Sequence, residues 1–273
     1  MKKIVAGILI MTMALSMSAC GAKQEEAAAA SSAKSEVAES AEASGDLTTV
    51  VGGELHMATN AAFPPYEMTD DAGGYEGIDV EIATAIAEKL GLELVVDDMD
   101  FASVIAAVQS GKADIAMAGL TVNEERKQNI DFTDSYATGV QVIIVPEGSA
   151  IASVDDLSSE IKIGCQEATT GYIYCSDDYG EEAVVSYTNG ATAIQSLLAG
   201  KVDCVVIDSE PAKQFVAANE GLQILDTEYV TEEYAIGISK ENNALLDAVN
   251  AALQELIADG TVDAVIAKYI NAE

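Results

Sequence analysis

The 273-residue sequence contains one arginine, Arg126, and one histidine, His56, against 46 acidic residues. Its formal net charge of −33 argues against nucleic-acid binding, because phosphates would be repelled. Four cysteines without a CxxC pair, together with a lone histidine, argue against a zinc site, and we expect no metal and no cofactor. A codon bias would explain the scarcity of arginine, but it leaves the role of Arg126 open.

The composition, with 49% hydrophobic and 22% charged residues, is that of a globular chain long enough for two lobes. The N-terminus has the three regions of a secretory signal: Lys2 and Lys3, an apolar run over 4–15, and small residues over 16–19. That apolar run is too short to span a bilayer comfortably, and no later segment approaches the length needed.

The segment "MSAC" resembles the lipobox of bacterial lipoproteins, in which the cysteine carries the lipid (palmitate among its acyl chains) and becomes the mature N-terminus. Met17 stands where lipoproteins prefer Leu, and an ordinary cleaved signal with an incidental cysteine is the alternative. We therefore predict a signal peptide over 1–19, a lipidated Cys20, and a disordered Ala/Ser/Glu tether up to residue 46. Such a chain would be extracytoplasmic and held at the membrane only by its lipid.

Three further cysteines, Cys165, Cys175 and Cys204, are an odd set, so at most one pair could bridge within the chain. Cys165 and Cys204 lie in strand-like runs and are interpreted as small core residues. The sequence does not predict a disulfide.

A weak internal repeat organises the folded part of the chain. Residues 103–119 and 192–208 share a helix-period apolar stretch, a Gly-Lys-x-Asp turn and an apolar strand, as one helix-to-strand step of an α/β lobe would. Aligning the two copies places Gly119 and Asp208 at the same point, beyond the carboxyl ends of their strands. Ligands bind beyond those ends in open α/β sheets, so the two residues are predicted to meet across one cleft.

Strand and helix patterns around both copies predict two α/β lobes, with two strand-like crossings between them. The predicted ranges are 47–141 plus 239–273 for lobe 1, 146–232 for lobe 2, and 142–145 and 233–238 for the hinge strands.

Six motifs occur in order from about residue 54 to 270: "ATNAAFPPYE", "GGYEGIDVEIATAIAEKLG", "MDFASVIAAVQSGKADIAMAGLTVNEERKQNIDFTDSY", "GCQEATTGY", "GKVDCVVIDSEPA" and "LQELIADGTVDAVIAKYI". Together they resemble the polar amino-acid-binding proteins of bacterial ABC importers, the solute-binding family 3. The resemblance implies the two-lobed periplasmic-binding-protein type II fold, a monomer, and delivery of a captured amino acid to an ABC permease and its ATPase.

The resemblance also implies roles for individual residues. Arg126 matches the arginine that takes the ligand α-carboxylate, a group that suits a planar two-pronged donor. Asp208 and the carbonyl of Gly119 match the acceptors of the α-ammonium. The remaining matches are Thr121 and Thr170 in the carboxylate pocket, Phe63 and Phe101 as the aromatic sandwich, and Asn60 and Gln166 at the side-chain tip. Basic-amino-acid and glutamine binders usually carry Asp where this chain has Asn60, so a neutral polar ligand such as glutamine is favoured over a basic one.

Other interpretations exist for most of these residues. Arg126 could be a solvated residue at a helix start, Asp208 a helix N-cap, and Phe63 and Phe101 ordinary core residues. The fold could also serve a dehydratase or similar lyase, although no histidine, cysteine dyad, metal spacing or phosphate loop falls in the cleft motifs. A component that presents ligand to a separate sensor is the third possibility. We predict a binding protein and not an enzyme.

Overall fold

The computed structural model describes residues 47–270. The predicted signal peptide, Cys20 and the tether lie outside these residues. Among the described residues, no helix combines the length and the apolar character that a membrane span requires.

The first lobe is a parallel sheet with helices on its faces. Strand β1 pairs in parallel with β5 on one side and β6 on the other, and β12 continues the sheet antiparallel to β6. A three-stranded sheet lies beside it. The elements are β1 (Glu54–Thr59), β2 (Ala62–Phe63), β3 (Glu67–Thr69), β4 (Tyr75–Glu76), α1 (Ile78–Leu90), β5 (Glu93–Asp98), α2 (Phe101–Gln109), β6 (Ile115–Ala116), α3 (Glu124–Lys127), α7 (Asn243–Ala258) and α8 (Thr261–Tyr269).

The second lobe has the same construction. Strand β8 pairs in parallel with β9 and β10, and β10 pairs antiparallel with a long strand that comes from the first lobe. The elements are the short 3-10 helix η1 (Val154–Asp156), β8 (Ile163–Gln166), α4 (Thr170–Tyr179), β9 (Val184–Tyr187), α5 (Gly190–Leu198), β10 (Cys204–Asp208), α6 (Ser209–Ala218) and β11 (Leu222–Ile224).

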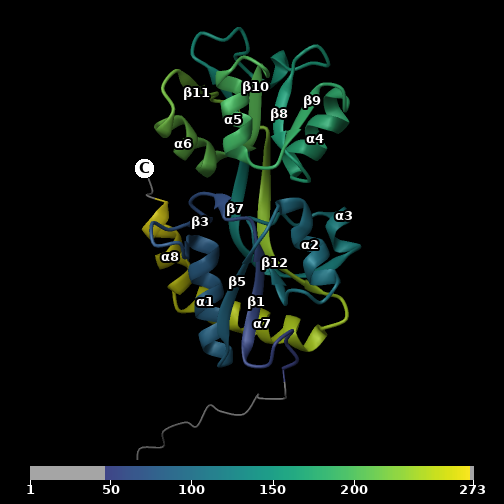
Figure 1. The fold of residues 1–273 in the computed structure, drawn as a ribbon, viewed down its shortest axis with the longest axis vertical. Helices are drawn as coiled ribbons and strands as arrows, with labels where there is room; N and C mark the ends of the chain where they lie inside the picture. The colour runs from purple at the N-terminus through teal and green to yellow at the C-terminus, as the bar shows by residue number, and fades with distance from the viewer. Residues whose placement is uncertain (1–46, 271–273) are drawn as a thin grey trace, which may run out of the picture. The chain divides into compact units, whose positions relative to one another are not determined.

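Two long antiparallel strands, β7 (Ile130–Pro146) and β12 (Val230–Ser239), run from one lobe into the other (Figure 1). Residues 142–144, part of a predicted hinge, pair with β10 inside the second lobe, whereas 137–139 pair with β12. The lobe boundaries stay a prediction, and we propose that bending occurs in the two-stranded part.

The internal repeat appears in the structure as α2–β6 and α5–β10. Gly111 and Gly200 take φ values of 67° and 64° in the two turns, the left-handed conformation that glycine adopts without a steric penalty. Asp114 accepts a hydrogen bond from the backbone N–H of His56, and Asp203 accepts one from that of Lys162, each at 2.8 Å. Each aspartate therefore fixes its turn to the neighbouring strand in the same way, and the repeat places equivalent strand ends at one cleft.

The remaining cysteines pack in the second lobe. Cys165, Cys175 and Cys204 are fully buried free thiols in a core cluster between β8, α4 and β10. The interpretation of Cys165 and Cys204 as small core residues is confirmed.

Candidate functional site

A cavity lies between the lobes, where the carboxyl ends of β6 and β10 meet. Its free volume is about 30 Å³. It is lined by Asn60, Phe63, Glu67, Phe101, Ala118, Gly119, Thr121 and Arg126 from the first lobe, and by Gln141, Gln166, Thr169, Thr170, Val206, Ile207 and Asp208. All nine residues predicted to bind ligand are in this set; their role in binding stays a prediction.

Arg126 is a buried cation at one end of the cavity. Its backbone N–H donates to Asn123, the N-cap of the four-residue helix α3, which holds the side chain turned inward with 5% of the residue exposed. Nη1 donates to the carbonyl of Thr121 at 2.8 Å, and the guanidinium carbon lies 5.5 Å from the centre of the Phe101 ring. Burial lowers the pKa of Arg126 below its ordinary value. A solvated surface role is therefore wrong.

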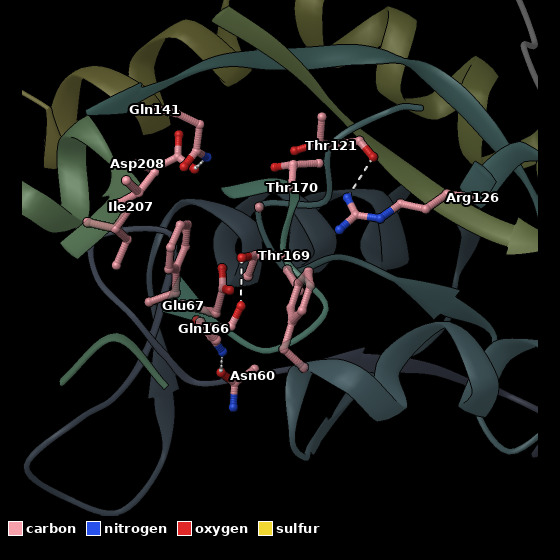
Figure 2. A pocket seen from close by; sticks show the side chains of 15 residues that line it. Asn60, Glu67, Thr121, Arg126, Gln141, Gln166, Thr169, Thr170, Ile207 and Asp208 are labelled. Atoms are coloured by element: carbon pink, nitrogen blue, oxygen red, sulfur yellow. Dashed lines mark hydrogen bonds between the residues drawn. The ribbon is translucent and has the colours of Figure 1, made fainter. Parts of the chain in front are cut away.

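Asp208 is a buried carboxyl group at the other end (Figure 2). It is the N-cap residue of α6, but its side chain makes no capping bond and instead accepts from Gln141 Nε2 at 2.6 Å. The second oxygen, Oδ1, lies near the Tyr234 hydroxyl beside Gly139, without a well-formed hydrogen bond. Burial raises the pKa of Asp208 to about 7, against the lowering effect of the Gln141 donor. Its carboxylate is thus short of a cationic partner.

Two hydrogen bonds between described residues join the lobes across the cavity. Arg126 Nη2 donates to the carbonyl of Ala168 at 3.1 Å, and Gln166 Nε2 donates to Asn60 Oδ1 at 2.9 Å. Ala168 has a φ of 63°, an unfavourable conformation for a residue with a side chain, and it places this carbonyl toward the arginine. With so little free volume and these contacts made, the described conformation is closed.

Beneath Gly119 lies a pair of buried carboxylic acids, Glu67 and Asp79. Asp79 accepts from the Gly119 N–H and the Tyr136 hydroxyl, both at 2.8 Å. Burial raises the pKa of Asp79 to about 6 and, with the nearby Asp79 charge, raises that of Glu67 well above its ordinary value. No donor in the described part of the chain reaches either Glu67 oxygen. A proton held by Glu67 lets it donate to Asp79, and Asp79 in turn fixes the Gly119 peptide.

We expect Glu67→Gln to raise the free energy of unfolding at pH 8, because the amide avoids the cost of keeping a carboxyl protonated in the folded chain at that pH. The raised pKa of Glu67 means that the folded chain retains a proton that the unfolded chain releases, so stability falls as pH rises above about 4.5. The amide does not titrate and can still donate to Asp79. Urea unfolding at several pH values, with the exposed Glu76→Gln as control, tests this; a loss of stability at pH 8 contradicts it.

Several residues of the site were missed from the sequence. Gln141 donates to both Asp208 and Glu232, and Thr169 caps α4 through the N–H of Tyr172. A lone glutamine inside the apolar run "VQVIIVP" was a usable signal for Gln141. The buried acids Glu67, Asp79 and Glu232 could not be identified from the sequence. Nothing in it distinguishes them from the other acidic residues among the 46 in the chain.

Comparison with known proteins decides the family. The model of the bacterial extracellular solute-binding proteins, family 3, matches residues 55–272. The chain belongs to this family. The predicted family and its two-lobed α/β fold are thereby confirmed, and the family 3 description places its members outside the cell.

Relatives of this family 3 protein are named as amino-acid-binding proteins. A probable histidine-binding protein of Neisseria gonorrhoeae is 31% identical, with 100% of this chain and 97% of the relative aligned. The arginine-binding extracellular protein ArtP of Bacillus subtilis is 30% identical over 81% of this chain and 87% of its own length.

Two solved structures of the same fold extend the comparison. An ancestral arginine-binding protein bound to glutamine has a TM-score of 0.76 and 37% identity, covering 81% of this chain and 99% of that one. The ancestral amino-acid-binding protein AncCDT-1, described as a precursor of cyclohexadienyl dehydratase, has a TM-score of 0.74 and 31% identity over 80% of this chain and 95% of its own.

Proposed function

We propose that this chain captures a free polar amino acid by hinge closure and delivers it to the permease and ATPase of an ABC transporter. One observation carries the proposal: a buried cation, Arg126, and a buried anion, Asp208, line one cavity from opposite lobes. An amino acid presents a carboxylate and an ammonium on the same carbon, which suits this pair of charges. The names of the relatives support the same ligand class.

In this proposal, the α-carboxylate replaces the two backbone carbonyls now bound by Arg126. The planar guanidinium can donate to both carboxylate oxygens. The backbone N–H of Thr170, the first residue of α4, has no acceptor within its own helix and can donate to the same carboxylate. Thr121 lines the same end. Each charge-assisted bond contributes roughly 1.5–3 kcal/mol.

The α-ammonium lies between Asp208 and the carbonyl of Gly119. A ligand held by Arg126 from the first lobe and Asp208 from the second is bound fully only when the lobes are closed. That difference in affinity between open and closed states is what drives closure. The contacts from Arg126 to Ala168 and from Gln166 to Asn60 break when the site opens for entry.

The ligand side chain is proposed to lie between Phe63 and Phe101 and to end at Asn60 and Gln166. Both tip residues are neutral amides, and Asn60 is held by a bond from its Nδ2 to the carbonyl of Met99 at 2.8 Å. These amides favour a neutral polar side chain such as that of glutamine. A guanidinium or ammonium tip would find no carboxylate in either tip residue.

We further propose that Cys20 carries the lipid that holds the protein at the membrane, after removal of a signal peptide, and that the protein acts as a monomer. The sequence motif supports the anchor, and the extracellular description of the family agrees with export.

A thermal-shift screen of the twenty amino acids and cystine, followed by calorimetry of those that stabilise the protein, tests the function. Binding to the folded state alone raises the melting temperature, so we expect an upward shift with glutamine or another neutral polar amino acid. A shift confined to arginine or lysine contradicts the neutral preference. No shift with any of these compounds contradicts the proposed function.

A dehydratase remains the second candidate because of the likeness to AncCDT-1 and because Asp208 and Glu67 are cavity carboxyls with raised pKa values. Incubation of the purified protein with arogenate or prephenate is expected to give no product. Product formation would make the chain an enzyme.

A further inference from the structure

Glu232, in the crossing strand β12, is a buried carboxylate on which three donors from different parts of the molecule converge. Its Oε2 accepts from the hydroxyls of Thr121 at 3.2 Å and Thr170 at 2.9 Å, and from Gln141 Nε2 at 3.0 Å. Thr121 belongs to the first lobe and Thr170 to the second. Glu232 is 5% exposed, and its other oxygen, Oε1, is buried and makes no well-formed hydrogen bond with a described residue; the Tyr174 side chain also faces this carboxylate. Burying such a carboxylate is costly, so its position beside a ligand site indicates a role there.

The bonding of Glu232 determines what the two threonines offer to the cavity. An ionised carboxylate can only accept hydrogen bonds, whereas a hydroxyl has one proton and two lone pairs. Because Thr121 and Thr170 both direct their protons to Glu232, only oxygen lone pairs remain for a molecule in the cavity that they line. Lone pairs attract an ammonium and repel a carboxylate.

We propose that Glu232 is a positioning residue that sets both hydroxyls as acceptors for the ligand α-ammonium, and so makes the site require an amino group. This inference rests on the proposed amino-acid-binding function. The α-carboxylate is then left to Arg126 and backbone N–H groups, and the ammonium, with three N–H donors, gains acceptors beyond Asp208 and Gly119.

The arrangement of charges agrees with this division of the site. Figure 2 shows Thr121 and Thr170 between Asp208 and Arg126. The α-carbon of an amino acid, with its carboxylate and ammonium, would lie there. Gln141 Nε2 donates to Asp208 and to Glu232, so one amide group bridges the two carboxylates and fixes both. Glu232 also interacts electrostatically with Arg126, so it balances part of the buried positive charge.

The test compares the dissociation constant of an amino acid with that of its des-amino analogue. Suitable pairs are glutamine with glutaramate, or arginine with 5-guanidinopentanoate, according to the screen. In Glu232→Leu, the acceptor of both threonine protons is removed, so the hydroxyls of Thr121 and Thr170 are free to turn their protons into the cavity. We expect calorimetry to show the preference for the amino acid falling by about tenfold or more, the equivalent of one hydrogen bond to a charged group.

The matched control is Glu233→Leu. Glu233 is the next residue of β12 and is exposed, and within the described part of the chain its carboxylate accepts only from the Ser135 hydroxyl, so this variant should keep the wild-type preference. If Glu232→Leu weakens both ligands equally, or leaves the preference within about twofold of wild type, Glu232 is merely structural and the inference is wrong.

Thr170→Val tests the same inference without altering Glu232, in case Glu232→Leu does not fold. If the hydroxyl accepts from the ammonium, only the amino acid loses affinity and the preference falls. If the hydroxyl donates to the carboxylate, both ligands lose affinity equally, which overturns the inference. A wild-type protein that binds no amino acid at all would instead reject the proposed function itself.

Discussion

Replacing Arg126 by alanine is expected to weaken amino-acid binding by about 2–5 kcal/mol, the usual range when one partner of a buried charge pair is truncated. Without the guanidinium, the ligand carboxylate enters a cavity in which every other side chain that could carry a charge at neutral pH is acidic. The carbonyls of Thr121 and Ala168, which now accept from Arg126, would face that carboxylate directly. Isothermal titration calorimetry measures the loss.

Two further variants show whether charge or shape matters. Lys127→Ala removes the neighbouring basic residue, which is exposed and pairs with Glu124 within α3, and should leave affinity unchanged. Arg126→Lys keeps the charge but lacks the two-pronged donor, so it should recover only part of the affinity. Near-wild-type affinity in Arg126→Ala would end the assignment of this residue to the ligand carboxylate.

The fold was accessible from the sequence because its signals are local. The Gly-Lys-x-Asp turns, the apolar strands after them, and the left-handed glycine that ends α1, Gly91, lie within short windows. Two of these windows repeat, and aligning them was enough to predict that Gly119 and Asp208 meet at one cleft. The C-terminal helices α7 and α8 are separated in the same local way, by the left-handed Gly260.

The buried acids could not be predicted in this way, because burial is decided by contacts between distant segments. Asp79 lies in the first turn of α1, where acidic residues are common, and only its bond to Gly119, 40 residues later, shows that it supports the site. Glu232 meets Thr121 across 111 residues of sequence. Ala168 looks ordinary in "QEATT", and its left-handed conformation appears only in the structure.

Asp208→Asn is expected to weaken binding of an amino acid by about 2–4 kcal/mol at pH 8, because the ammonium loses its buried counter-charge. The wild-type protein should also show pH-dependent binding. The pKa of Asp208 is raised to about 7, so below that pH the ligand must displace a proton from its carboxyl, and affinity should fall by up to about tenfold per pH unit. The amide variant should lack that component. Calorimetry from pH 5 to pH 8 measures both effects.

The stability of the ligand-free protein should fall as pH rises, whereas its affinity for the ligand should rise. This difference separates a change in binding from misfolding. The pKa of Asp208 rises from 3.8 in a free side chain to about 7 in the fold, so the folded chain holds a proton that the unfolded chain has released. Stability without ligand therefore falls as pH rises from about 4 to about 7, and Asp208→Asn removes that loss. The control Asp203→Asn alters an exposed aspartate just before the same strand and should leave binding unchanged. If Asp208→Asn binds amino acids as tightly as wild type at pH 8, the ammonium is held elsewhere.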